Sequence, residues 1–471
     1  MSGLELIALT PVLILALGAT VLLMTGAWFR QPTPLVAAGV IVALAAAVTA
    51  LVLVPPVPEV GGLFATNAYG RFFTALWAWI ALLVLLLSER YIREHLLPPG
   101  EYVSLVLFAA AGMSLLSSAT SLIGIFLGLE AFTLALYILI ASNRRSDLAA
   151  EAGLKYLVLG AVATGFLAFG IALIYAGSGS FHLPEALQGL QTTGTLRPWG
   201  LLGWGMLLVA IGFKISLVPF HFWTPDVYQG APTPVVGLLA TGSKGAVVAA
   251  LIGLFASGAS GWQEMTSLLW MLSALTMLAG ALCALVQTDI KRLLAYSSVV
   301  HMGTVLIGLI GQTKDGLAAA TFYTVVYALA SLGCFAVIAS LAQGDDEPAT
   351  IEQWRGLGFR HPLRGGVLAV LLLSLAGMPP TAGFMAKLSI FHAAIQADLV
   401  GLALIGILAS LISFAFYLKV IIAMFMADET AAPRHPGTQS EHLVLMVCTA
   451  AVLLFGVLPG LLFDLIGSIL S

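Results

Sequence analysis

The chain has 471 residues, of which 60% are hydrophobic and 9% charged. A water-soluble globule cannot keep that much apolar surface out of water, so the composition predicts an all-α polytopic membrane protein. The net charge of −3 is too small to indicate a nucleic-acid partner. Cys283, Cys334 and Cys448 stand alone in apolar segments without a CxxC, so we expect neither a disulfide framework nor a metal or iron–sulfur site.

Apolar runs long enough to cross a bilayer, about 18–25 residues, divide the chain into fourteen expected spans. They cover residues 6–27, 34–54, 72–88, 103–120, 122–141, 153–176, 199–220, 234–256, 266–286, 292–310, 317–342, 366–391, 400–426 and 442–468. The first lacks the basic flank of a cleaved signal peptide and is expected to remain as a span. Only a short polar turn at 117–121 separates the fourth from the fifth, and the orientation of every later span depends on it.

The distribution of basic residues predicts the orientation, because cytoplasmic loops carry the excess of Lys and Arg. With the N-terminus outside, the inner loops hold Arg30, Arg90, Arg93, Arg144, Arg145, Lys291, Arg292, Arg355, Arg360, Arg364 and Arg434. The outer loops hold only Arg71, Arg197 and Lys314. Both termini are therefore expected to face the periplasm.

Five spans carry a single ionisable side chain where the bilayer interior would be: Glu130, Lys214, Lys244, Lys387 and, nearer a span end, Lys419. Such a group costs about 2.5 to 17 kcal/mol at the centre of a membrane helix, so several persist only where they pair, meet internal water or move charge. We interpret the first four as a proton-translocation path in which Glu130 pairs with Lys214. The alternative is a static ion pair, but apolar replacement of such a pair is often neutral, so stability alone would not explain it.

Three further residues are weaker relay candidates: His301, Lys419 and His221. A histidine titrates near neutral pH, although a lone membrane histidine can equally be a hydrogen-bonded helix contact. Lys419, like Lys155, lies near a span end, where a long side chain can simply snorkel to the interface. The proline-rich segment 221–234 is expected to be an ordered cytoplasmic-side loop and not a helix, with His221 or Asp226 lining an entrance.

Helix breakers lie beside two of the lysines, at 214–221 and at 377–383. Paired broken helices are typical of an inverted repeat with its ion site near the midplane. An offset of five spans predicts two inverted five-helix repeats, spans 4–8 at 103–256 and spans 9–13 at 257–426, with broken helices 7 and 12. Residues 1–102 and 427–471 flank them. On this matching Lys214 corresponds to Lys387, Lys244 to Lys419, and Glu130 to the region of His301.

Three stretches resemble the antiporter-like membrane subunits of respiratory complex I. They are GFKISLVPFHFWTPDVYQGAPTPV at 212–235, DIKRLLAYSS at 289–298 and SLAGMPPTAGF at 374–384. The resemblance extends over nearly the whole chain. Three features are typical of the N-type subunits within that family: the motif DVYQGAP, a lysine in place of glutamate at 387, and a chain too short for a long lateral helix.

The resemblance implies a proton-translocating membrane-arm subunit of a bacterial NADH:quinone oxidoreductase in the inner (plasma) membrane. The glutamate and lysines of the family fall on Glu130, Lys214, Lys244 and Lys387. FMN, iron–sulfur clusters, NADH and quinone would then be held by other subunits, with no cofactor on this chain. The implied partners are other membrane-arm subunits, including further antiporter-like ones, and the lipid bilayer. An Mrp-type Na⁺/H⁺ antiporter subunit and a membrane-bound hydrogenase subunit share the buried Lys/Glu scheme and stay open as alternatives.

Overall fold

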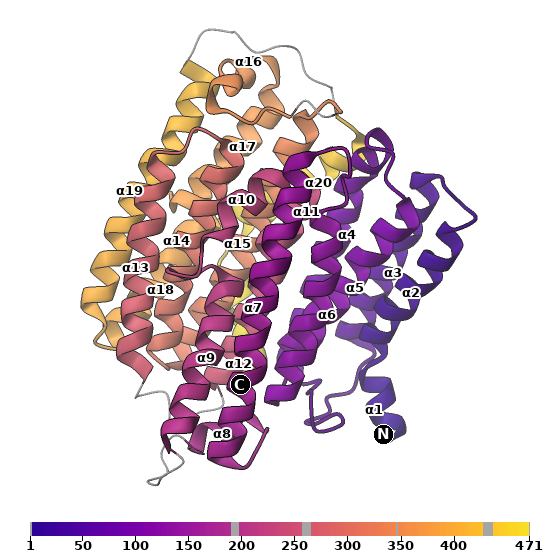
Figure 1. The fold of residues 1–471 in the computed structure, drawn as a ribbon. Helices are drawn as coiled ribbons and strands as arrows, with labels where there is room; N and C mark the ends of the chain where they lie inside the picture. The colour runs from indigo at the N-terminus through magenta and orange to yellow at the C-terminus, as the bar shows by residue number, and fades with distance from the viewer. Residues whose placement is uncertain (1, 190–196, 257–264, 345–346, 427–436, 471) are drawn as a thin grey trace.

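The computed structural model describes residues 2–189, 197–256, 265–344, 347–426 and 437–470. Long, roughly parallel helices fill it (Figure 1), and β pairing within those ranges is limited to isolated bridges. Helices satisfy their own backbone hydrogen bonds, which a bilayer core cannot do for them. The predicted all-α membrane fold is therefore confirmed.

The helices follow the order of the expected spans. The N-terminal unit comprises α1 (Gly3–Ala8), α2 (Thr10–Gly26), α3 (Pro32–Val52) and α4 (Ala68–Glu94). Next come α5 (Pro99–Ser117), α6 (Leu122–Ile140), α7 (Asp147–Ser178), α8 (Leu183–Gln188), α9 (Arg197–Ile215), α10 (Trp223–Gly230), α11 (Thr233–Leu238), a π-helical turn (Leu239–Ser243) and α12 (Lys244–Ala256). The remainder comprises α13 (Thr266–Leu285), α14 (Ile290–Ile310), α15 (Lys314–Leu341), a 3-10 turn (Ile351–Trp354), α16 (Leu357–Arg360), α17 (Pro362–Ala376), α18 (Ala382–Gln396), α19 (Val400–Met426), α20 (Gln439–Val457) and α21 (Gly460–Leu470).

Twelve helices among the described residues are long and apolar enough to cross a membrane. Each of the fourteen expected spans coincides with at least one helix, but α2 has only 17 residues and the twelfth span is divided between α17 and α18. The count of fourteen crossings thus stays a prediction. The critical polar turn is present: α5 ends at Ser117, and the Ser121 hydroxyl caps α6 by accepting from the Gly124 amide.

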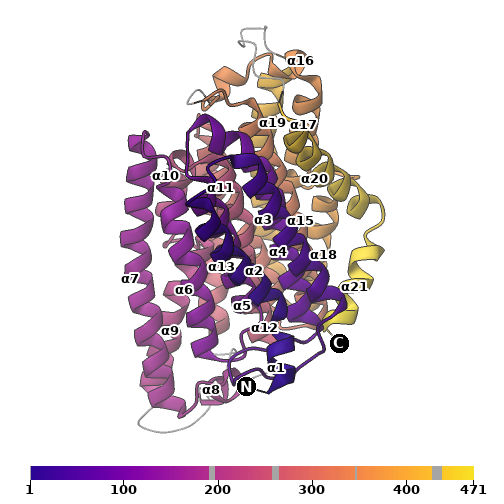
Figure 2. The same cartoon turned by 90° about the vertical axis from the view of Figure 1, so that its right-hand side faces the viewer.

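Both chain termini lie at the same end of the bundle, and α16 lies at the opposite end (Figures 1 and 2). Of the basic residues assigned to inner loops, Arg434 lies outside the described residues.

One expectation was wrong: the proline-rich segment 221–234 is largely helical. It forms α10 and the start of α11. Pro225 and Pro234 fall in the first turns of these helices, where the amide that proline lacks would have no intrahelical partner. A high proline content therefore marks two helix starts here.

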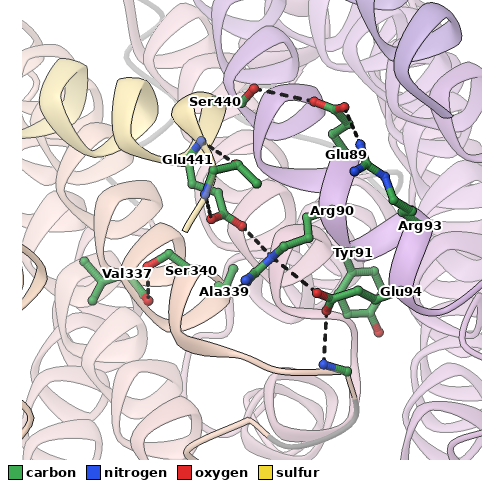
Figure 3. A network of polar contacts seen from close by, with 12 residues as sticks. Glu89, Arg90, Tyr91, Arg93, Glu94, Val337, Ala339, Ser340, Ser440 and Glu441 are labelled. Atoms are coloured by element: carbon green, nitrogen blue, oxygen red, sulfur yellow. Dashed lines mark hydrogen bonds and ion pairs between the residues drawn. The ribbon is translucent and has the colours of Figure 1, made fainter. Parts of the chain in front are cut away.

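A buried ionic cluster ties the N-terminal unit to α20, near the C-terminal end of the chain (Figure 3). The Arg90 Nε atom lies 2.9 Å from a Glu441 carboxylate oxygen, and both side chains are buried. Arg90 also donates to the Ala339 carbonyl at the end of α15, at 2.5 Å. The cluster thereby joins α4, α15 and α20, which are far apart in sequence.

We expect Arg90→Ala to lower the free energy of unfolding by about 3–5 kcal/mol, because it leaves the Glu441 carboxylate buried without this partner. Arg93→Ala is the matched control from the same helix. Arg93 pairs with Glu89 at 2.8 Å, but its side chain is 58% exposed, so its loss should cost less than about 1 kcal/mol. Thermal unfolding of the purified protein compares the two, and equal effects would contradict a structural role for the cluster.

Candidate functional site

Four lysines are buried in the described part of the chain, and one of them, Lys291, pairs with Glu347. The other three are Lys214, which is 3% exposed, Lys244 at 0% and Lys387 at 7%. Within the described residues none of them forms an ion pair, and each amino group donates instead to a neutral oxygen. Buried charges are ordinarily paired with an opposite charge, so three without a contacting carboxylate are unusual.

Lys214 lies on the last turn of α9, just before the helix breaks. Its Nζ donates to the Thr133 hydroxyl of α6 at 2.8 Å and lies 5.6 Å from the centre of the Tyr156 ring. Ser216, directly after α9, has a left-handed backbone with φ of 64°, which turns the chain out of the helix. The broken helix is held by Trp223, whose indole N–H donates to the Phe213 carbonyl at 2.9 Å.

The expected direct pair between Glu130 and Lys214 is not formed among the described residues. The Glu130 carboxylate is half-buried and accepts from the Thr164 hydroxyl of α7 at 2.7 Å. It nevertheless lies close enough to attract the Lys214 ammonium. In place of a direct contact between the two charged groups, Thr133 accepts from the Lys214 amino group and Thr164 donates to the Glu130 carboxylate.

Lys244 opens α12 immediately after the π-helical turn Leu239–Ser243. Turns of this kind inside α-helices are frequent at functional sites. Its Nζ donates to the Ser298 hydroxyl of α14 at 2.6 Å, and the Tyr228 and Trp223 rings lie 5.2 and 5.8 Å away. Aromatic faces attract a cation, so these rings partly compensate the missing counter-ion.

Lys387 lies on α18, after the second break, and donates to the Ala376 carbonyl at 2.8 Å. That carbonyl belongs to the last residue of α17, whose intrahelical partner is lost at the break. Gly377 follows with φ of 88°, and a Cβ atom there would lie 2.7 Å from the Lys387 Cδ. The glycine is therefore required both by its backbone and by the close approach of the lysine.

The predicted correspondence of Lys214 with Lys387 stays a prediction. Lys214 precedes its break, on the last turn of α9, whereas Lys387 follows its break, on α18. The two broken helices can correspond even though their lysines lie on opposite sides of the break. The acceptors also differ, since Lys214 donates to Thr133 of α6 and Lys387 to the Ala376 carbonyl of α17.

His301, on α14, is buried and lies one helical turn beyond Ser298. Its Nδ1 is 2.7 Å from the Tyr323 hydroxyl and its Nε2 is 3.1 Å from the Tyr417 hydroxyl. His301, Tyr323 and Lys387 line one small cavity of about 10 Å³, roughly the room that a single water needs. No sequence pattern indicated the tyrosines, which lie 22 and 116 residues away from the histidine.

The two remaining candidates occupy different surroundings. His221 is buried just after the first break, and its Nδ1 has no hydrogen-bond partner among the described residues. Lys419 is exposed and donates to the Gln287 carbonyl at 3.1 Å, so it is not gathered with the buried lysines. In the described ranges no group of three His, Cys, Asp or Glu side chains could hold a metal ion.

A second polar cluster anchors α10, the helix that follows the first break. Asp226 accepts from Lys155 of α7 at 2.6 Å and from Arg292 of α14 at 2.7 Å. Burial opposes ionisation of Asp226, but the two hydrogen bonds outweigh it and hold the pKa of this carboxyl below its ordinary value. Lys155 and Arg292 were not predicted as anchors, since nothing local marks their partner.

Comparison with known proteins gives a consistent result. The family model described as "NADH:quinone oxidoreductase/Mrp antiporter, TM" matches residues 119–413. The chain is 43% identical over 463 residues to NADH-quinone oxidoreductase subunit N of Geotalea uraniireducens (strain Rf4), covering 98% of both. It is similar to a chain of respiratory complex I from Thermus thermophilus with bound aureothin, with 35% identity, a TM-score of 0.83 and coverage of 96% and 98%. A chain of the Mrp complex from a Dietzia species shares the fold, with a TM-score of 0.82 at 20% identity and coverage of 99% and 96%.

We expect Asp226→Asn to loosen α10 and lower the thermal unfolding midpoint of the purified protein at neutral pH, because a neutral amide binds two cations less strongly. The pKa of Asp226 is lowered on folding, so its stabilisation is present at neutral pH and is lost as the pH falls. The difference between the variant and the wild type should therefore narrow on acidification. Glu151→Gln is the control, since Glu151 is the more exposed of the two carboxylates on Lys155, and a larger effect there would contradict the assignment.

Proposed function

We propose that this chain, which belongs to the family of NADH:quinone oxidoreductase and Mrp antiporter membrane subunits, moves protons through a line of buried lysines while it serves as an N-type membrane-arm subunit of NADH:quinone oxidoreductase. One observation carries the proposal: Lys214, Lys244 and Lys387 are all buried and all held by neutral oxygens. The proton-translocation residues are these three and Glu130.

The neutral acceptors matter because they hold an amino group in either protonation state. A contacting carboxylate would bind an ammonium ion strongly and oppose release of its proton. A hydroxyl or carbonyl oxygen accepts from a neutral amine as well as from an ammonium ion. Lysines held in this way are better suited to proton transfer than to a structural role as fixed charges.

Contacts between the lysines support a continuous route. Tyr156 contacts Lys214, Trp223 contacts Lys244, and the rings of Tyr156 and Trp223 lie 4.9 Å apart. Beyond Lys244 the route continues through Ser298 to His301, which shares its cavity with Lys387. We assign His301 a relay role. We assign His221 and Lys419 to the entrances of the route.

The driving step in this proposal is a change in the distance between Glu130 and Lys214. Separation removes the nearby negative charge that favours the Lys214 ammonium, so the proton moves on toward Lys244. Moving one charge against 100 mV requires about 2.3 kcal/mol. A change of roughly two pH units in proton affinity, at about 1.4 kcal/mol each, is sufficient in scale.

The repeats at 103–256 and 257–426 are part of the proposal, with 1–102 and 427–471 as flanking units. The same pairs of helices pack in both halves: α5 on α6 as α13 on α14, α7 on α9 as α15 on α17, and α5 on α12 as α13 on α19. Each half contains one broken helix. The shared packing supports an internal duplication better than the position of the lysines does.

Redox chemistry belongs to other subunits in this proposal. FMN, the iron–sulfur clusters, NADH and quinone are bound elsewhere in the complex, and this chain holds no cofactor. Its partners are other antiporter-like and membrane-arm subunits in the bacterial inner membrane. The Mrp-type antiporter alternative is weaker, because that likeness is 20% in sequence against 43% to a subunit N, and no observation favours a hydrogenase.

Lys244→Ala should leave the complex assembled, since it strands no buried carboxylate, and should lower proton pumping about tenfold or more. Lys244→Arg should not restore it, because a guanidinium keeps its charge and does not deprotonate. Proton uptake by reconstituted vesicles and the NADH:quinone reductase rate measure both variants. If Lys244→Arg pumps at the wild-type rate, deprotonation of Lys244 is not on the path.

The proposed orientation has both termini in the periplasm and the loop of Arg144 and Arg145 in the cytoplasm. Single cysteines at Ser2 and Asp147, in a variant without the three natural cysteines, should react with an impermeant thiol reagent from the periplasmic and the cytoplasmic side respectively. Neither substitution changes the basic residues that set the orientation. Labelling of both sites from one side would refute the orientation.

A further inference from the structure

His301 is enclosed by hydroxyl groups in a way that the lysine path alone does not explain. Tyr323 of α15 and Tyr417 of α19 each place a hydroxyl at hydrogen-bond distance from one ring nitrogen, 2.7 Å from Nδ1 and 3.1 Å from Nε2. The histidine and both tyrosines are at most 4% exposed. Among the described residues these two hydroxyls are therefore the hydrogen-bond partners of the imidazole, and each can pass a proton to it.

The type of partner decides which charge states the ring can adopt. A neutral imidazole has one N–H donor and one acceptor, whereas an imidazolium has two donors. A carbonyl can only accept and an ammonium can only donate, so either would favour one state. A hydroxyl does both, and two hydroxyls keep the ring fully hydrogen-bonded whether it is neutral or protonated.

The two tyrosines face different surroundings. Tyr323 lines the small cavity shared by His301 and Lys387. The Tyr417 hydroxyl is also hydrogen-bonded to the Ser297 hydroxyl, so its proton has a second acceptor. When the Nε2–H donates to Tyr417, Tyr417 can in turn donate to Ser297, and no polar atom of this chain of groups is left unpaired.

We propose that Tyr323 is a further relay residue that carries protons between Lys387 and His301, and that Tyr417 is a positioning residue that holds the imidazole and accepts its second N–H; the inference rests on the proposed function. In the transfer step the His301 imidazolium gives its Nδ1 proton to the Tyr323 hydroxyl, and Tyr323 gives its own hydroxyl proton to the neutral Lys387 amine across the cavity. His301 becomes a neutral imidazole and Lys387 an ammonium. One proton and one positive charge move, and only O–H and N–H bonds change.

The test uses the intact complex with Tyr323→Phe and Tyr417→Phe. Tyr323→Phe should lower proton pumping and the coupled quinone reductase rate about tenfold, and Tyr417→Phe about threefold, with assembly unchanged. Tyr102→Phe is the matched control: Tyr102, on α5, is equally buried, and its hydroxyl lies 3.1 Å from that of Ser88 on α4, away from the path. It should pump at the wild-type rate.

His301→Gln separates a relay from a structural contact. A glutamine amide can hydrogen-bond both tyrosines, yet it does not carry a proton. We expect this variant to lose pumping as Tyr323→Phe does, and the double variant to lose no more than either single one, since both act in one step. Wild-type pumping by Tyr323→Phe overturns the inference. So do an unimpaired His301→Gln, an additive double variant, or an equal loss in Tyr102→Phe.

Failure of this inference is distinguishable from failure of the proposed function. If Lys244→Ala and Lys387→Ala abolish pumping while Tyr323→Phe does not, the lysine path stands and the tyrosine relay is wrong. If both lysine variants pump normally, the proposed function itself is wrong, whatever the tyrosine variants do.

Discussion

The rest of the structure depends on how three amino groups are kept inside a bilayer-spanning bundle without a contacting counter-ion. A charge in that environment is costly, so the protein must supply oriented oxygens at each site. Thr133 and Ser298 supply hydroxyls, and Ala376 supplies a carbonyl. Each acceptor comes from a different helix or half-helix, so the packing of the whole bundle sets the environment of each lysine.

Helix interruptions make this arrangement feasible. An unbroken helix uses its carbonyls internally, whereas the end of α17 leaves the Ala376 carbonyl free for Lys387. Near Lys244 the helix is altered by the π-helical turn, and after Lys214 it ends at the left-handed Ser216. All three lysines therefore lie beside an irregular backbone segment, and the surrounding helices hold these segments in place.

The charged residues in the described part of the chain fall into two groups with different partners. Arg90 with Glu441, and Lys155 and Arg292 with Asp226, are fixed by carboxylates and join distant helices. The lysines of the path, in these same residues, hydrogen-bond to neutral oxygens and form no ion pair. Carboxylate pairing locks a charge and a helix contact together, while a neutral acceptor leaves the proton exchangeable, so the choice of partner distinguishes structural from transport roles.

The sequence by itself determined the all-α membrane fold, the approximate spans, the two helix breaks, and Glu130, Lys214, Lys244 and Lys387, because hydrophobic length and isolated charges are local signals. Only the tertiary structure decided which oxygen each lysine contacts, that Glu130 binds Thr164, and that α10 is helical. It also brought Tyr323 and Tyr417 to His301. These contacts join residues tens to more than a hundred positions apart, and side-chain packing between helices, which no local pattern encodes, selects them.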